Sequence, residues 1–512
     1  MRVLLVSTYE LGHQPIHVAS PASRLTSDGH QVRCLDLSVD PMDPEDVQWA
    51  EVIGFSVPMH TAMRLAVEAC TEVRRIAPSA PVCFYGLYAL VDADSGVADK
   101  AIAGEYEPEL AKWIAELAQT SNESDESTPS EAPSIADPGV EAPLIAVPSG
   151  TDPRDTQQRV IVSIGKASGD FGLPARELLP PLERYARLEA GGERRLAGYV
   201  EASHGCSHRC RHCPVPVVYD GRTRVVGIDA LLADIAQLVA HGAEHLTFGD
   251  PDFLNRPRHA CRAVQAVHGA FPDLTFDVTV KVEHIIAHSG LWPSFRDAGC
   301  LFVVSAFEST SDRVLRILDK GHSARDEFAA VKLLRDAGIE PRPSLLPFTP
   351  WSEPRDIVDL LDFVARCDLV GNIDPVQFAI RLLVPPGSLL LTAGLLDGLL
   401  DGYDPEHLGW TWHSHDQRLD TLADELGAIA AQAGDEAWPP AVAYTAIRHT
   451  ALQALGYDPG MPEVRADETL RSPLPPELRP RLSEPWFCCA EPTCTQLGAV
   501  RPLEAAMNAA PG

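Results

Sequence analysis

The chain has 512 residues, of which 45% are hydrophobic and 22% are charged, and its formal net charge at pH 7 is -30. A chain of this length and apolar content can bury more than one core, so we expect at least two globular units. The acidic balance repels phosphate backbones, and no basic cluster reverses it locally, which argues against nucleic acid as a partner.

The N-terminus enters an apolar run at once, without the basic region and cleavage site of a signal peptide. No run of about 18 apolar residues occurs without a polar interruption, so we expect no membrane partner and a cytoplasmic protein. The 12 cysteines are clustered, which in a reducing compartment indicates metal or redox chemistry rather than disulfides.

Residues 1–116 alternate short apolar runs with segments of helical spacing. This alternation predicts a small α/β domain, flavodoxin-like, with a doubly wound parallel sheet. The expected strands are 2–7, 31–37, 52–57 and 81–86, and the expected helices lie around 15–28 and 60–77. Ligands of such sheets bind where the strands end, which is here near 9–13, 58–60 and 86–88.

Over 117–157 the composition shifts to Ser, Glu, Pro, Asp and Thr, which predicts a disordered acidic linker. Strand and helix signals alternate again over 158–390, which predicts a partial (β/α)6 barrel with its site at the carboxyl ends of the strands. The expected barrel strands are 198–202, 245–248, 275–281, 301–305, 342–346 and 376–382. Residues 391–512 are expected to be mostly helical and to end in a cysteine-rich tail.

Three cysteines follow the first expected barrel strand at the spacing C-x3-C-x2-C, namely Cys206, Cys210 and Cys213. Three thiolates can hold three irons of a cubane cluster, and without a fourth cysteine nearby the fourth iron stays open to a chelating ligand. A structural zinc site is the alternative, and its fourth ligand would be His204, His208 or His212. The position directly after a strand favours the iron–sulfur cluster.

At these residues the chain resembles the radical S-adenosylmethionine (SAM) superfamily, and the resemblance covers roughly 175–390. It implies a 4Fe-4S cluster on the three cysteines and SAM bound to the open iron through its amino and carboxylate groups. One electron would then cleave the sulfonium to a 5′-deoxyadenosyl radical, so that the cofactors carry the chemistry. Where many members have an aromatic residue that touches adenine, this chain has His212.

Two further segments resemble cofactor-binding positions of the superfamily. The segment 246–253 is similar to the one that receives the methionine amino group, and its candidates are Gly249, Asp250 and Asp252. An Asp-Pro turn without a ligand is the alternative there. Candidates for ribose or carboxylate binding at the ends of the next strands are Lys281, Ser305 and Glu308. For each of these, a salt-bridging or capping role is the alternative.

Residues 1–116 also resemble a shortened cobalamin-binding domain. The segment from Ala103 to Glu107 is similar to the Gly-Glu segment that closes such domains. The Asp-x-His-x-x-Gly motif that gives a histidine to cobalt is absent, and Tyr85-Gly86-Leu87 stands where many relatives have Gly-Gly. The resemblance leaves two alternatives, a domain that binds cobalamin and a domain retained only for docking.

Near the end of the chain, three cysteines lie within seven residues, namely Cys488, Cys489 and Cys494. The string Cys-Cys-Ala-Glu-Pro resembles a group of radical SAM proteins defined by this tail or by its selenocysteine version. Selenium has a lower pKa and faster exchange than sulfur, so the resemblance implies a redox or nucleophilic role at Cys489. We expect the three cysteines to be catalytic and the tail to reach the barrel mouth. A buried structural pair and a metal-binding knot are the alternatives.

Together these features predict a radical SAM enzyme, an oxidoreductase or transferase, that acts on an unidentified small molecule or peptide. The resemblance implies a 4Fe-4S cluster and SAM as cofactors, with cobalamin as a further candidate, and an electron donor such as a flavodoxin or ferredoxin. The alternative is a zinc- or cluster-binding regulatory or electron-transfer protein that has no substrate of its own.

Overall fold

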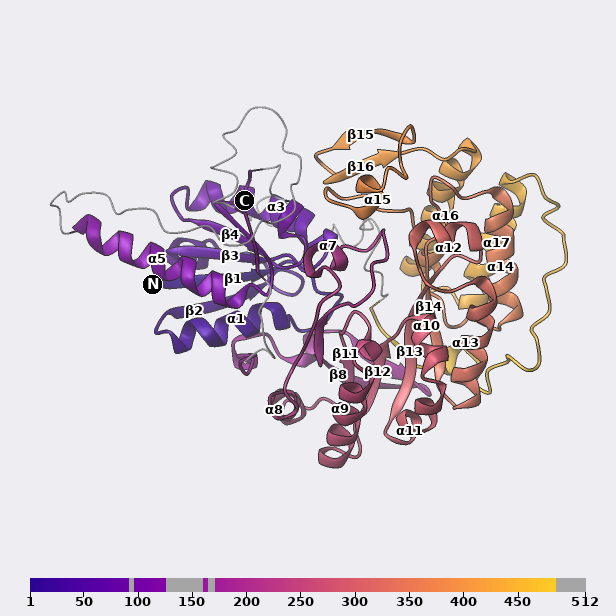
Figure 1. Ribbon diagram of the computed structural model, residues 1–512, viewed down its shortest axis with the longest axis horizontal. Coiled ribbons are helices and arrows are strands. Elements are labelled where there is room, and N and C mark those ends of the chain that lie inside the picture. The colour runs from indigo at the N-terminus through magenta and orange to yellow at the C-terminus, as the bar shows by residue number, and fades with distance from the viewer. Residues whose placement is uncertain (92–95, 126–159, 164–170, 485–512) are drawn as a thin grey trace, which may run out of the picture.

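The computed structural model describes residues 1–91, 96–125, 160–163 and 171–484, which form two α/β units side by side (Figure 1). The cysteine-rich tail and most of the expected linker lie outside these residues. Two boundaries differ from the expectation. Helix α5 (Glu107–Asp125) continues past residue 117, where the linker was expected to begin. Strand β6 (Val160–Ser163), expected with the barrel, instead pairs with β5 (Lys100–Gly104) of the N-terminal unit.

The N-terminal unit is a six-stranded parallel sheet in the order β2-β1-β3-β4-β5-β6, which confirms the flavodoxin-like fold. Its first four strands, close to those expected, are β1 (Arg2–Ser7), β2 (Gln31–Asp36), β3 (Val52–Ser56) and β4 (Val82–Tyr85). Successive side chains of β1 enter different cores, because neighbours in a strand point to opposite faces. Leu4 and Val6 pack towards α3 (His60–Ile76), whereas Val3 and Leu5 pack towards α1 (Ile16–Ser27) and α5.

The second unit is an open, curled sheet in the order β14-β13-β12-β11-β8-β7-β17. Its parallel strands are β8 (Glu193–Val200), β11 (His245–Phe248), β12 (Thr275–Thr279), β13 (Cys300–Glu308) and β14 (Glu340–Leu345). The helices on its outer side are α8 (Ile228–Ala240), α9 (Pro257–Ala270), α13 (Ala324–Asp336) and α14 (Pro354–Arg366) (Figure 1). The fold is therefore the expected partial barrel, with active-site positions at the carboxyl ends of the strands.

The sixth expected strand, 376–382, does not form. Residues Pro375–Phe378 make a 3-10 turn, and only one bridge, from Phe348 to Arg381, continues the sheet. A proline suits the first position of a helical turn, because its fixed φ is helical and its missing N–H is not needed there. The parallel part of the barrel therefore has five strands.

The C-terminal region is largely helical, as expected, with α16 (Gln417–Asp435) and α17 (Pro440–Ala454) packed against the barrel. It also contains a hairpin, β15 (Leu400–Asp404) and β16 (Gly409–Trp412). After α17 the chain runs back along the barrel and ends in β17 (Arg481–Leu482), which pairs with β7 (Arg187–Ala190). We call residues 467–484 the C-terminal strap.

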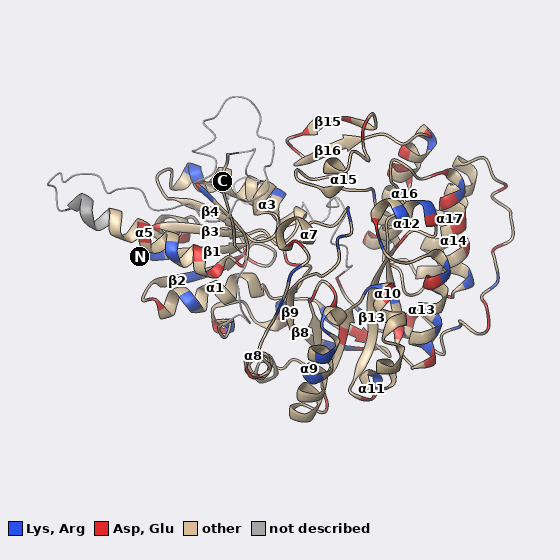
Figure 2. Ribbon diagram, viewed as in Figure 1, with Lys and Arg blue, Asp and Glu red and all other residues tan. Residues whose placement is uncertain are grey.

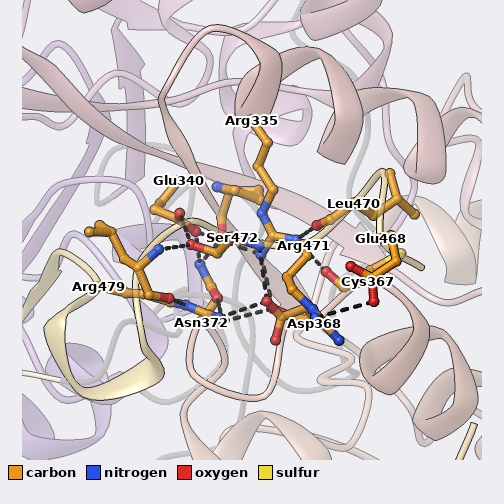
Figure 3. A network of polar contacts seen from close by, with 12 residues as sticks. Arg335, Glu340, Cys367, Asp368, Asn372, Glu468, Leu470, Arg471, Ser472 and Arg479 are labelled. Atoms are coloured by element: carbon orange, nitrogen blue, oxygen red, sulfur yellow. Dashed lines mark hydrogen bonds and ion pairs between the residues drawn. The ribbon is translucent and has the colours of Figure 1, made fainter. Parts of the chain in front are cut away.

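Buried charges hold this strap to the barrel (Figure 3). The Arg479 guanidinium donates to Asp368 Oδ2 at 2.8 Å and to Asn372 Oδ1 at 2.7 Å. Ser472 donates to Glu340 at 2.5 Å, and Arg335 donates to the carbonyls of Leu470 and Cys367. Arg479 is only 3% exposed, so it is shielded from water, and hydrogen bonds within the network take the place of hydrogen bonds to water. The network holds the strap against the barrel.

Acidic and basic residues are interspersed along the outer helices (Figure 2). Among the described residues, no helix is both long enough and apolar enough to cross a bilayer.

Candidate functional site

The cysteine loop begins where the first barrel strand ends. Strand β9 (Ser203–Gly205) pairs with β10 (Thr223–Val225), and Gly205 turns the chain with φ of +75°. A Cβ at this position would lie 2.4 Å from the carbonyl oxygen of Arg222, so only glycine fits. Cys206 and Cys210 follow and are buried, and Cys213 is half-buried.

All three cysteines line one cavity between the N-terminal unit and the barrel, with a volume of about 310 Å³. No other cysteine among the described residues lines it. The N-terminal unit contributes strand ends where ligands were expected, including Glu10, Leu11, His13, Pro58, Met59, Gly86, Leu87 and Tyr88. The barrel contributes Tyr199, Glu201, Gly249, Asp250, Thr279, Lys281, Glu308, Lys320 and Arg342.

His212, Glu308 and Lys320 form a buried cluster beside the cysteines. The Glu308 carboxylate lies 3.1 Å from His212 Nε2 and accepts from Lys320 Nζ at 3.1 Å. Burial alone would raise the pKa of Glu308, but Lys320 and His212 outweigh it and lower the pKa to about 2. The backbone of Glu308 is left-handed, with φ of 68°, a strained conformation that persists where the surroundings enforce it. A fixed carboxylate and ammonium thus stand next to the thiols.

The two aspartates of segment 246–253 occupy different places. Asp250 lines the cavity and accepts from the backbone N–H of Ala202 at 2.9 Å and from Ser203 Oγ at 2.5 Å. Burial raises the pKa of Asp250 to about 7. Asp252 does not line the cavity; it accepts from Leu254 N at 3.2 Å and faces His284. Gly249 lines the cavity beside Tyr199, whose hydroxyl leaves no room there for a Cβ.

Of the candidates Lys281 and Ser305, only Lys281 lines the cavity. Lys281 lines the cavity, with its ammonium 3.5 Å from Glu283. Phe302, Val304 and Ala306 of β13 face the cavity, so the alternation of the strand turns Ser305 to the other face. Ser305 Oγ is buried there without a hydrogen-bond partner in the described structure.

The histidines that would complete a zinc site are engaged elsewhere. His204 Nε2 lies 3.0 Å from Glu201, His212 Nε2 contacts Glu308, and His208 Nε2 lies 3.3 Å from His284. In addition, the three cysteine sulfurs do not gather within 4.8 Å of one another, as the ligands of one metal ion would. The arrangement fits a multi-iron cluster better than a single zinc ion.

Sequence patterns did not single out two charged groups of the cavity. Lys320 follows the helix after β13, and no spacing rule links it to the cysteines, which lie more than 100 residues earlier. Glu201 sits between His204 and His17, which is 3.5 Å away. Burial acts to raise the pKa of Glu201, but the two histidines lower it to about 2, and the pKa of His204 rises to about 9 against the effect of burial.

The strap ends at this cavity. Leu482 and Glu484 line it, and the Tyr9 hydroxyl donates to the Glu484 carboxylate at 2.7 Å. The strap therefore touches the N-terminal unit and the barrel sheet within a few residues. The tail cysteines Cys488, Cys489 and Cys494 come next in the chain and lie outside the described residues.

Comparison with known proteins places residues 200–364 in the Radical SAM superfamily. An uncharacterized methyltransferase from Pyrococcus horikoshii is 23% identical over 232 residues, which are 45% of this chain and 48% of that protein. A ribosomal protein uS12 methylthiotransferase from Porphyromonas gingivalis is 23% identical over 37% of this chain and 46% of its own length. The chain thus spans about half the length of the curated relatives it matches.

Solved structures share the fold over a larger part of the chain. The cobalamin-dependent SAM radical enzyme OxsB, with aqua-cobalamin and SAM bound, superimposes on 85% of this chain and 67% of its own, with a TM-score of 0.62 and 13% identity. The radical SAM methyltransferase TsrM from Kitasatospora setae covers 70% of this chain and 69% of its own, with a TM-score of 0.51 and 18% identity. At these identities the likeness concerns the fold, including the pairing of an N-terminal sheet domain with the barrel.

Proposed function

We propose that this member of the radical SAM superfamily is an enzyme that binds a 4Fe-4S cluster through Cys206, Cys210 and Cys213, and with it cleaves SAM to start radical chemistry on a small molecule or peptide. One observation carries the proposal: three thiols from one loop line a single cavity together with fixed charges at the carboxyl ends of the barrel strands. When bound, the cluster would supply one electron from an external donor to the sulfonium of SAM, which releases methionine and a 5′-deoxyadenosyl radical.

The residues around the thiols suit a zwitterionic ligand. Glu308, held ionised by Lys320 and His212, offers a carboxylate to an ammonium or a ribose hydroxyl. Lys281 offers an ammonium to a carboxylate from the end of β12. Asp250 holds the chain at Ala202 and Ser203, just before the cysteine loop, so we assign it a positioning role. Phe302 and Val304 add apolar side chains to the lining.

The experiment is anaerobic reconstitution with iron and sulfide, reduction with dithionite, and addition of SAM. We expect about four irons per chain and release of 5′-deoxyadenosine and methionine. Cys206→Ala should lose both, whereas Cys261→Ala, a half-buried cysteine on α9 away from the cavity, should lose neither. Full iron content in Cys206→Ala would contradict the cluster assignment. A full cluster without SAM cleavage would instead favour an electron-transfer protein.

The tail supports a second part of the same proposal, in which Cys488, Cys489 and Cys494 take part in the reaction. Glu484 lines the cavity, and Cys489 follows it by five residues, which span at most about 18 Å because an extended chain covers at most about 3.6 Å per residue. We propose that this length lets the tail act at the cavity, where a thiol near the substrate would reduce, capture or carry a group.

Cobalamin is the second ligand that the cavity favours. The N-terminal wall includes apolar side chains at strand ends, among them Leu11, Met59 and Leu87, and it lines the same cavity as the cysteine loop. The test is the cobalt content of the reconstituted chain after incubation with hydroxocobalamin and gel filtration. Leu87→Trp, which fills this wall, should abolish retention; no retention by the wild-type chain would leave the N-terminal unit as a docking domain.

A further inference from the structure

A cluster of His208, Asp252 and His284 lies behind the cysteine loop, outside the cavity lining. Each side chain offers one ligand atom, and the three atoms lie within 4.8 Å of one another. They come from three segments: the cysteine loop, the turn after β11, and helix α10 (Val282–Ala287), which follows β12. We propose that this cluster binds a divalent cation of the zinc type, separate from the iron–sulfur cluster.

The distances around His208 suit one shared ion. His208 Nε2 lies 3.3 Å from His284 Nε2 and 3.7 Å from Asp252 Oδ2, whereas Asp252 contacts His284 through its other ring nitrogen, Nδ1. Ligands on a tetrahedral zinc ion, with bonds of about 2.0–2.1 Å, lie about 3.3–3.4 Å apart. Two imidazoles and one carboxylate are also the ligand types that zinc and its neighbours in the periodic table prefer.

The carboxylate of the cluster is held by the two histidines. The Asp252 side chain is completely buried, and its Oδ2 atom lies 2.7 Å from His284 Nδ1 and 3.7 Å from His208 Nε2. A buried carboxylate needs a positive charge beside it, and either a protonated His284 or a bound cation would supply that charge. The histidine side chains are 19% and 16% exposed, so water can reach the ion as a further ligand.

The surroundings complete the arrangement of a metal site. His208 Nδ1, the ring nitrogen away from the other two ligands, lies 3.8 Å from the Glu283 carboxylate. At this distance the pair is an ion-pair contact, longer than the hydrogen bond that usually fixes the ring of a histidine ligand. The nearby Lys281 ammonium is itself 3.5 Å from Glu283, so its charge is partly compensated. An ion here would tie the cysteine loop to the ends of β11 and β12 and so hold it in position.

The test uses cobalt on the reconstituted, iron-loaded full chain. Co²⁺ is added anaerobically, excess is removed by gel filtration, and bound cobalt and iron are counted by mass spectrometry; the visible spectrum reports cobalt in a nitrogen and oxygen site. We expect one cobalt that His284→Gln binds at least about tenfold more weakly at unchanged iron content. His288→Gln, one turn along, is the matched control and should bind like the wild-type chain.

Asp252→Asn is the second variant, because the amide keeps the acceptor for Leu254 N and removes only the charge. Asp252→Asn serves as the test if His284→Gln does not retain the iron–sulfur cluster. Equal cobalt in the wild-type chain and in Asp252→Asn would overturn the proposal and leave the three residues as a hydrogen-bonded chain. These counts do not depend on SAM cleavage, so they stand apart from the test of the proposed function.

Discussion

At the residue scale, Glu308 and Lys320 form a buried ion pair that joins β13 to the chain after α12 (Asp312–Leu318) next to the cysteines. The Lys320 side chain is 4% exposed. Glu308→Gln would leave this ammonium without its anion, and breaking such a pair costs about 3–5 kcal/mol. We therefore expect a clearly lower melting temperature for Glu308→Gln. Glu308→Gln combined with Lys320→Met removes the stranded charge and should recover part of the loss; equal melting temperatures for the single and double variants would contradict this account.

Glu10 gives the N-terminal wall a pH dependence. It is 7% exposed, and burial raises its pKa from 4.5 to about 7. The folded state then binds the proton more tightly than the unfolded chain, so the free energy of unfolding falls as the pH rises from about 4.5 to about 7. Glu10→Gln has no carboxyl group to titrate, so its free energy of unfolding should not fall in this way; the decrease in the wild-type chain is on the order of 3 kcal/mol. Melting curves from pH 5 to pH 8 should show the variant gaining stability over the wild-type chain; a constant difference would refute the assignment.

The cysteine triplet was predictable because its spacing is local. The sequence could not separate Asp250 from Asp252, since both follow β11 at a distance that suits a ligand, and only the turn decides which one faces the cavity. Lys320 and His284 reach their places through contacts between strands that are far apart in the chain. Such contacts produce no periodic pattern of residues in a single sequence.

At the scale of elements, apolar alternation predicted the strands with buried neighbours on both sides, such as β1 and β11. It failed at 376–382, where apolar residues pack as a 3-10 turn and a single bridge. It also missed β17, because two residues show no period, and their pairing with β7 depends on the strap.

The strap network should determine how firmly the chain end is held. Arg479→Ala removes the guanidinium that donates to Asp368 and to the buried Asn372, which costs about 1–3 kcal/mol. We expect a lower melting temperature and faster proteolysis within 467–484. Arg471→Ala is the matched control, because Arg471 is 53% exposed and pairs only with the exposed Glu468, so its loss should cost about 0.5 kcal/mol or less. Equal proteolysis of both variants would show that the network does not hold the strap.

At the scale of the whole molecule, the loop after β1 and the C-terminal strap meet at the cavity. The loop after β1 contacts the strap through Tyr9 and Glu484, and the backbone N–H of Ala186 donates to the carbonyl of Gly12 at 2.8 Å. The N-terminal unit, the barrel and the strap thus enclose one space. Hydrophobic patterning predicts each unit separately, but it carries no information on how two units face each other.

This closure leads to a prediction for the tail, which starts from the cavity wall at Glu484. If Cys489 works beside the radical step and is not a cluster ligand, Cys489→Ser should keep its iron content and its rate of 5′-deoxyadenosine release from SAM. A short thiol–amine reagent should join Cys489 to Lys281 of the cavity, because its ammonium lies at the cavity lining near the cysteine loop. Cys261, on the outer helix α9, is the matched control and should not form this link. Peptide mapping by mass spectrometry identifies the pairs. Links from Cys489 only to surface lysines such as Lys332, or loss of iron in Cys489→Ser, would rule out the proposed place of the tail.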